Sequence, residues 1–105
     1  MALRIFWSEL AEDKLADIFE YYKTKASLRT ARKLVNDIVD QTLLLANNPF
    51  IGQKEELLLD RQEGFRYLVY KNYKIIYWIN ETKSWIEISN VFDSRQNPIK
   101  LQKTK

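Results

Sequence analysis

The chain has 105 residues, of which 46% are hydrophobic and 30% are charged, and these values are typical of one globular domain, residues 1–105. It contains no cysteine and no histidine, which excludes disulfides, thiolate or imidazole metal sites, cysteine nucleophiles and Ser-His-Asp triads. The net charge of +3 is divided unevenly, because residues 1–63 hold 9 Lys/Arg against 11 Asp/Glu and residues 64–105 hold 8 against 3. A basic C-terminal part suits a polyanion or an acidic protein segment as partner.

The first half of the chain predicts a short strand followed by two helices. Residues 3–7 alternate in polarity and are rich in strand-forming residues. Ser8 can cap a helix over residues 9–25, in which apolar residues recur at helical spacing. Ser27 can cap a second helix over residues 28–46, which ends before the Asn-Asn-Pro that follows. We interpret the pair as an antiparallel helical hairpin; the alternative is a coiled-coil dimer seam on the second helix.

The second half of the chain predicts a sheet. A turn at Pro49–Gly52 leads into a polar loop, in which three consecutive leucines could form an apolar anchor or a short strand. Strands are then predicted over residues 65–70, 73–79 and 84–92, joined by turns at 71–72 and 80–83. The element order β-α-α-β-β-β predicts an α+β domain, in which a small twisted antiparallel sheet carries the helical hairpin on one face.

Alternation along these strands sorts the side chains into two faces. We expect one aromatic and aliphatic face to pack on the helices. The second face is expected to mix charged and aromatic residues, namely Arg66, Tyr70, Lys74, Trp78 and Glu87. Arg and Lys beside Tyr and Trp can bind phosphate and stack on a base; the alternative is ordinary cross-strand pairing, such as Lys74 with Glu87. Arg66 is the strongest candidate, because an unpaired charge within an apolar strand is costly.

Several segments in this order resemble the RelE/ParE superfamily, the toxins of bacterial type II toxin–antitoxin systems, often described as plasmid stabilisation proteins. The segments that carry the resemblance are Pro49–Gly52 after the second helix, Phe65–Tyr70, Tyr73–Tyr77 and Asn90–Pro98. The resemblance extends over nearly the whole chain. It implies the α+β fold given above, and it implies as partner a cognate antitoxin that wraps the toxin and masks its functional surface.

The resemblance also implies one of two activities. RelE-like members cleave mRNA on the ribosome without metal, and here Arg66 and Arg95 would contact the phosphate, with Tyr70 or Tyr77 as proton donor if the register allows. RNA-cleaving members often place a Tyr or His where this chain has Asp93, whose ordinary pKa of about 4 suits a proton donor poorly. ParE-like members poison DNA gyrase and need no catalytic residues, and we favour this branch.

The expected site residues differ between these two activities. If the protein cleaves RNA, the catalytic residues are Arg66, Arg95 and Tyr70; the expected binding residues are Arg66, Lys74, Trp78, Asp93 and Arg95. A non-catalytic module that binds nucleic acid or protein is the third alternative.

The expected partners are the antitoxin and either gyrase or the ribosome with its mRNA, in a toxin–antitoxin hetero-oligomer or a homodimer. We expect no metal and no cofactor. The sequence has no apolar run of about 18 residues and no signal-peptide layout, so a cytoplasmic protein without a membrane segment is expected.

Overall fold

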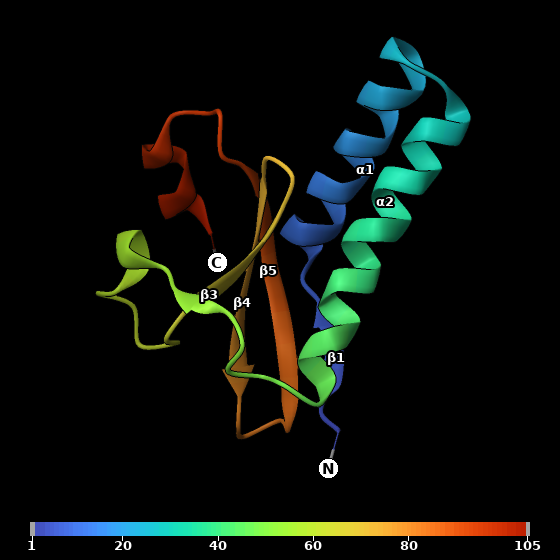
Figure 1. The fold of residues 1–105 in the computed structure, drawn as a ribbon. Helices are drawn as coiled ribbons and strands as arrows, with labels where there is room; N and C mark the ends of the chain where they lie inside the picture. Colours follow the sequence, from blue (N-terminus) through green and yellow to red (C-terminus); the bar gives the residue numbers. More distant parts are fainter. Residues whose placement is uncertain (1, 105) are drawn as a thin grey trace.

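The computed structural model describes residues 2–104 and has the predicted α+β architecture (Figure 1). The strands are β1 (Arg4–Trp7), β2 (Gln53–Lys54), β3 (Arg66–Tyr70), β4 (Tyr73–Asn80) and β5 (Trp85–Asp93). The helices are α1 (Glu9–Lys25) and α2 (Leu28–Leu43), with three short 3-10 helices, η1 (Leu44–Ala46), η2 (Glu56–Leu58) and η3 (Pro98–Lys103). The predicted elements are confirmed, whereas β2, η2 and η3 lie in segments that the sequence predicted as loop or tail.

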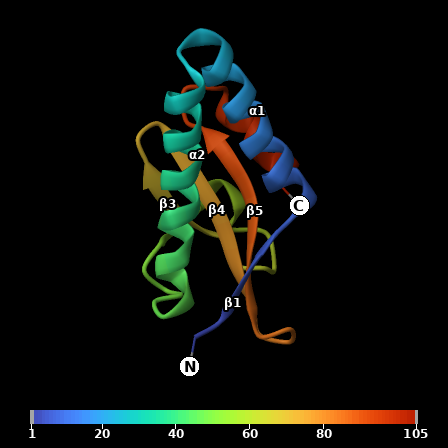
Figure 2. The same cartoon turned by 90° about the vertical axis from the view of Figure 1, so that its right-hand side faces the viewer.

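The two helices form the predicted antiparallel hairpin, which lies across one face of the sheet (Figures 1 and 2). The hydroxyl oxygen of Ser8 accepts the N–H of Ala11 at 3.1 Å, and that of Ser27 accepts the N–H of Thr30 at 3.1 Å. Both serines therefore cap their helices as predicted. The hairpin packs on the sheet through a buried stripe that contains Ala11, Ile18, Leu34 and Ile38, and Leu45 of η1 extends this stripe.

The strands form one sheet in the order β1-β5-β4-β3-β2. All neighbouring pairs are antiparallel except β1 and β5, which run parallel. The helical hairpin and strands β2, β3 and β4 lie between these two strands in the sequence, and a parallel pair needs such a long connection. The sheet is therefore antiparallel with one parallel edge pair.

A β-bulge in β5 changes the faces predicted for that strand. Ile76 pairs with Asn90 and Tyr77 pairs with Ile88, so Ser89 has no partner in β4. The extra residue reverses the alternation after it. Ile88 and Val91 consequently lie on the same face, in the core beneath the helices, whereas simple alternation assigns them to opposite faces.

The second face of the sheet is covered, which corrects the expectation of an open mixed face. A separate buried cluster joins Leu58 of η2 and Leu101 of η3 to Ile76 and Phe92 of the sheet and to Phe65, which directly precedes β3. Figure 1 shows η2 and the red C-terminal segment on the side of the sheet opposite the hairpin. Leu58 is thus the apolar anchor that the three leucines suggested, while Leu57 and Leu59 are exposed.

Candidate functional site

Tyr70 and Asp93 lie at the same end of the sheet, because both pair with Tyr73 across neighbouring strands. The Tyr70 hydroxyl donates to Asp37 Oδ2 of α2 at 2.7 Å, and Lys33 Nζ contacts the same oxygen at 3.1 Å. The hydrogen bond from Tyr70, with that from Lys33, lowers the pKa of Asp37 below its ordinary value. The same bond raises the pKa of Tyr70, which keeps its phenol protonated.

Arg95 forms an ion pair with Asp93 at the end of β5. Its Nε donates to Oδ1 at 3.1 Å and its terminal nitrogen to Oδ2 at 2.9 Å, while its backbone N–H donates to Oδ1 at 2.9 Å. Asn72 adds a fourth donor to this carboxylate, at 3.1 Å. The hydrogen bond from Arg95 is the largest cause that lowers the pKa of Asp93 to about 2. The two residues therefore form a neutral pair near neutral pH.

Arg66 lies at the other end of β3 and faces the helix side of the sheet. It pairs with Tyr77, and its guanidinium donates to the Gly52 carbonyl at 2.8 Å and lies 5.1 Å from the ring centre of Phe50. Tyr70 follows Arg66 by four residue steps along the strand, which corresponds to about 13 Å. The structure therefore does not bring Arg66 together with Tyr70 and Arg95.

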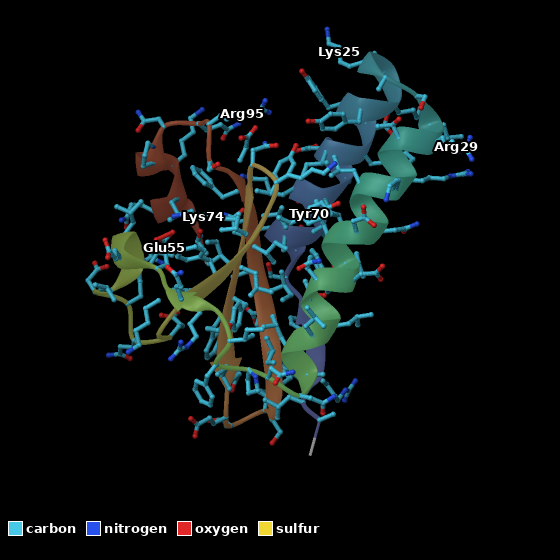
Figure 3. All side chains as sticks on the ribbon, viewed as in Figure 1. Lys25, Arg29, Glu55, Tyr70, Lys74 and Arg95 are labelled. Atoms are coloured by element: carbon cyan, nitrogen blue, oxygen red, sulfur yellow. The ribbon has the colours of Figure 1, made fainter. Side chains whose placement is uncertain are left out.

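Lys74 and Trp78 lie on the opposite face of the sheet from Arg66 and Tyr70, so the predicted common face of these residues is wrong. The register places Arg66 opposite Tyr77 and Val69 opposite Lys74, and this register could not be derived from alternation alone. Figure 3 shows Lys74 beside Glu55 on one side of the sheet and Tyr70 toward the helices on the other.

Lys74 and Trp78 both have acidic partners on that face. Lys74 Nζ binds Glu55 Oε1 at 2.8 Å and lies 4.4 Å from the ring centre of Tyr67. Trp78 Nε1 donates to Glu87 Oε2 at 3.2 Å. These two contacts replace the expected pair of Lys74 with Glu87, because the loop before η2 places Glu55 beside Lys74.

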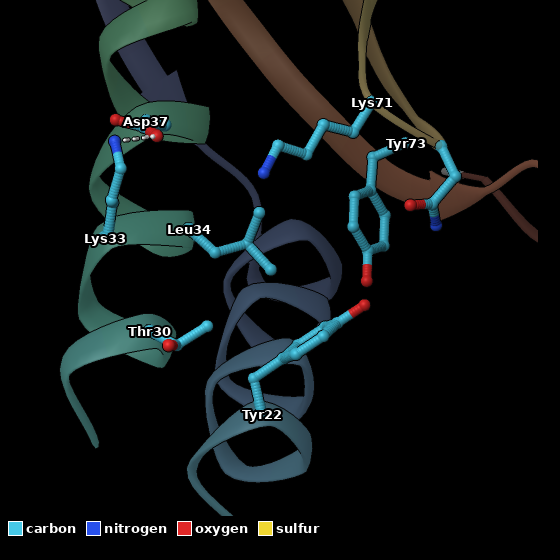
Figure 4. A pocket seen from close by; sticks show the side chains of 8 residues that line it. Tyr22, Thr30, Lys33, Leu34, Asp37, Lys71 and Tyr73 are labelled. Carbon is cyan, nitrogen blue, oxygen red and sulfur yellow. Dashed lines mark hydrogen bonds and ion pairs between the residues drawn. The ribbon is translucent and has the colours of Figure 1, made fainter. Parts of the chain in front are cut away.

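A small pocket lies between α2 and the turn that joins β3 to β4 (Figure 4). Its volume is about 150 Å³, and it is lined by Tyr22, Thr30, Lys33, Leu34, Asp37, Lys71, Asn72 and Tyr73. Burial and a hydrogen bond with Tyr22 raise the pKa of Tyr73. Asp37 is not among the candidate residues of the sequence analysis. A carboxylate between two apolar residues of a helix, here the buried Leu34 and Ile38, could have indicated that this part of α2 contacts the sheet.

An apolar groove runs along the helical hairpin beside the end of β1. Its volume is about 490 Å³, and its lining consists of Trp7, Leu15, Ala16, Phe19, Val35 and Val39 with Glu12 and Glu20. A concave apolar surface on a folded domain commonly marks a protein-interaction site.

Neither a metal site nor a membrane span is found within residues 2–104. No cluster of three or more acidic residues there is arranged to hold a metal ion. No helix in that range is long and apolar enough to cross a membrane.

Comparison with known proteins identifies a family model that matches the chain and a solved structure of similar fold. The family model described as "ParE toxin of type II toxin-antitoxin system, parDE" matches residues 5–98. A solved structure described as "Chromosomal ParDE TA system from P. aeruginosa" superposes with a TM-score of 0.72 at 19% sequence identity, covering 88% of this chain and 96% of that chain. At this identity the similarity concerns the fold. Among curated proteins, none matches this sequence.

Proposed function

The chain belongs to the ParE toxin family of type II toxin–antitoxin systems, and from this premise we propose that it inhibits growth by binding and poisoning DNA gyrase. Membership of this family implies a cognate antitoxin as partner. The choice of gyrase over the ribosome is the proposal.

The observation that supports this choice is the separation of Arg66 from Arg95. RNA cleavage needs cationic groups placed within hydrogen-bond distance of one phosphate and an acid near the leaving oxygen. Here Arg66 binds the Gly52 carbonyl at one end of β3, and Arg95 binds Asp93 at the other end of the sheet. This arrangement favours a toxin that acts by binding.

The apolar groove beside β1 is the surface that we assign to the antitoxin. Phe19 and Val39 line it together with Trp7, and an apolar groove between helices suits an amphipathic segment of the partner. The acidic Glu12 and Glu20 in the lining favour basic residues beside the apolar ones in that segment. A Val39→Glu variant is therefore expected to escape the antitoxin and remain toxic when both proteins are co-expressed, whereas Asp60→Lys, outside the groove, is expected to stay neutralised.

The test of the gyrase assignment is a supercoiling assay with the purified toxin, relaxed plasmid, gyrase and ATP. We expect loss of supercoiling and accumulation of cleaved plasmid, with no effect on relaxation by topoisomerase I as the matched control. A parallel cell-free translation reaction with primer extension tests the alternative. Normal supercoiling together with ribosome-dependent mRNA cuts would show that the protein cleaves RNA and that the gyrase proposal is wrong.

A further inference from the structure

The turn Pro49–Gly52, which lies between η1 and β2, exposes two large apolar side chains. Phe50 is 65% exposed and Ile51 is 55% exposed, and the two are adjacent in the sequence. We call these two side chains the apolar tip. Single exposed apolar residues are common on protein surfaces, so exposure alone does not indicate a function. The apolar tip differs from such residues because the backbone that carries it is firmly attached to the sheet.

Three long-range hydrogen bonds attach this backbone. The Tyr77 hydroxyl accepts the Gly52 N–H at 2.9 Å and donates to the Pro49 carbonyl at 2.8 Å. The Arg66 guanidinium donates to the Gly52 carbonyl at 2.8 Å. A Cβ atom at Gly52 would lie only 2.6 Å from the Tyr77 hydroxyl oxygen, so the turn also packs closely on the sheet. The apolar tip is therefore held in one place before any partner binds, which reduces the entropy that binding costs.

The apolar tip and the groove that we assign to the antitoxin lie at opposite sides of the sheet. The groove lies beside β1, the first strand in the order β1-β5-β4-β3-β2, whereas the turn is bonded to β3 and β4 and leads into β2. Figure 2 shows the green segment after α2 on the side of β3, and β1 on the other side. The groove is concave, whereas the turn presents its side chains outward. The two surfaces therefore suit different partners.

A second copy of the chain and a short amphipathic segment both fit the apolar tip poorly. Two exposed apolar side chains offer on the order of 200–300 Å², whereas a stable interface takes about 800 Å² from each partner. An amphipathic segment lays its own apolar side chains into a groove, and it has no pocket for a protruding ring. A folded partner has such pockets, and aromatic side chains that fill them contribute much of the binding free energy.

We propose that the apolar tip binds gyrase by inserting Phe50 and Ile51 into an apolar pocket of the enzyme. The inference rests on the proposed function and extends it, because it names the surface of the toxin that contacts the target. Gyrase is the folded partner in that proposal, and the antitoxin occupies the groove at the other side of the sheet.

The test is the concentration of purified toxin that half-inhibits supercoiling by the gyrase holoenzyme, measured for matched variants. Phe50→Ser combined with Ile51→Ser is expected to raise this concentration roughly tenfold or more, because loss of a central aromatic contact weakens binding by at least that factor. Phe50→Leu keeps an apolar side chain and is expected to stay within about threefold of the parent. Leu59→Ser is the matched control, because Leu59 is 62% exposed in a different loop, and it should stay within about twofold.

Two further measurements separate loss of target binding from failure to fold. The double variant changes only exposed side chains, so its thermal melting followed by circular dichroism should resemble that of the parent. It should also co-purify with the co-expressed cognate antitoxin as the parent does. Loss of that co-purification in a folded double variant would assign the apolar tip to the antitoxin and overturn the inference.

Other outcomes would also overturn the inference. Equal half-inhibiting concentrations for the parent and the double variant, or an equal loss in Leu59→Ser, would contradict it and leave the gyrase assignment intact. A parent that sediments as a dimer, with a double variant that sediments as a monomer, would assign the apolar tip to a second copy instead. Absence of gyrase inhibition by the parent itself would overturn the proposed function, and gyrase would then no longer be the occupant.

Discussion

Arg66 and Tyr77 lie directly opposite each other in β3 and β4 and hold the same turn, Pro49–Gly52. The Tyr77 hydroxyl accepts the Gly52 N–H at 2.9 Å and donates to the Pro49 carbonyl at 2.8 Å, while Arg66 donates to the Gly52 carbonyl at 2.8 Å. The turn exposes Phe50 and Ile51 at its tip. Arg66 and Tyr77 therefore attach a protruding apolar turn to the sheet.

Tyr77→Phe is expected to lower the free energy of unfolding by about 1–3 kcal/mol, because it leaves the N–H and the carbonyl of the turn without a partner in a buried site. Tyr77 is 0% exposed, so water cannot replace the missing hydroxyl easily. Urea unfolding measures the change. Tyr67→Phe is the control, since the Tyr67 hydroxyl bonds the exposed Gln53; an equal destabilisation in both variants would contradict the role given to Tyr77.

Arg66→Met is expected to destabilise the protein by about 1–3 kcal/mol, because it removes a charge-assisted hydrogen bond to the Gly52 carbonyl. The half-buried guanidinium serves this turn, so the gyrase inhibition per folded molecule should remain close to that of the parent. Unfolding curves and supercoiling assays on the same preparations separate the two effects. A variant that folds normally but no longer inhibits gyrase would instead show that Arg66 contacts the target.

Gly52→Ala is expected to cost about 1–3 kcal/mol through overpacking. A Cβ atom at this position would lie 2.6 Å from the Tyr77 hydroxyl oxygen and 2.7 Å from the Tyr67 carbonyl oxygen. A smaller additional destabilisation is expected when Gly52→Ala is made in the Tyr77→Phe protein, because one of the two clashing oxygens is gone. Strict additivity in this double-mutant cycle would argue that the clash does not involve the hydroxyl.

The fold was predictable because its signals are local. Ser8 and Ser27 cap helices in which apolar residues recur at helical spacing. The side chains of the strands alternate between the two faces, and short turns join the strands. The grouping of side chains on the sheet was not predictable, because one unpaired residue, Ser89, reverses the alternation within β5. A bulge of this kind depends on tertiary contacts: the Ser8 hydroxyl donates to the Ser89 carbonyl at 3.2 Å.

The site was less predictable than the fold because long-range partners define it. Sequence analysis singles out Arg66, Lys74 and Arg95 as candidate site residues. In the structure, the partner of Arg66 lies 14 residues away in the sequence, that of Lys74 lies 19 residues away and that of Arg95 lies 2 residues away. Only the Arg95–Asp93 pair is close enough in sequence to be inferred directly. The covering of the second sheet face by Leu101 was also missed, because the C-terminal segment has the composition of a polar, Lys-rich tail.

The Arg95–Asp93 pair is expected to make the free energy of unfolding depend on pH in the acidic range. Because the pKa of Asp93 falls to about 2 in the folded state, its contribution to stability is present above its ordinary pKa of about 3.9 and is lost as the pH falls toward 2. The stability deficit of Asp93→Asn relative to the parent should therefore shrink over this window. Unfolding measured at several pH values tests this, and Arg95→Gln should flatten the same part of the curve. A deficit that stays constant across the window would contradict the linkage.

Leu101→Ala is expected to lower the free energy of unfolding by about 2–5 kcal/mol, because it opens a cavity in a buried cluster. Leu101 is 0% exposed and packs with Phe65, Ile76 and Phe92. Arg61 fixes the same segment by donating to the Thr104 carbonyl at 2.8 Å. Leu59→Ala is the matched control, since Leu59 is 62% exposed, and it should change stability by less than about 0.5 kcal/mol. Similar small changes in both variants would show that η3 does not cover the sheet in solution, and the face that carries Lys74 and Trp78 would then be open to a partner.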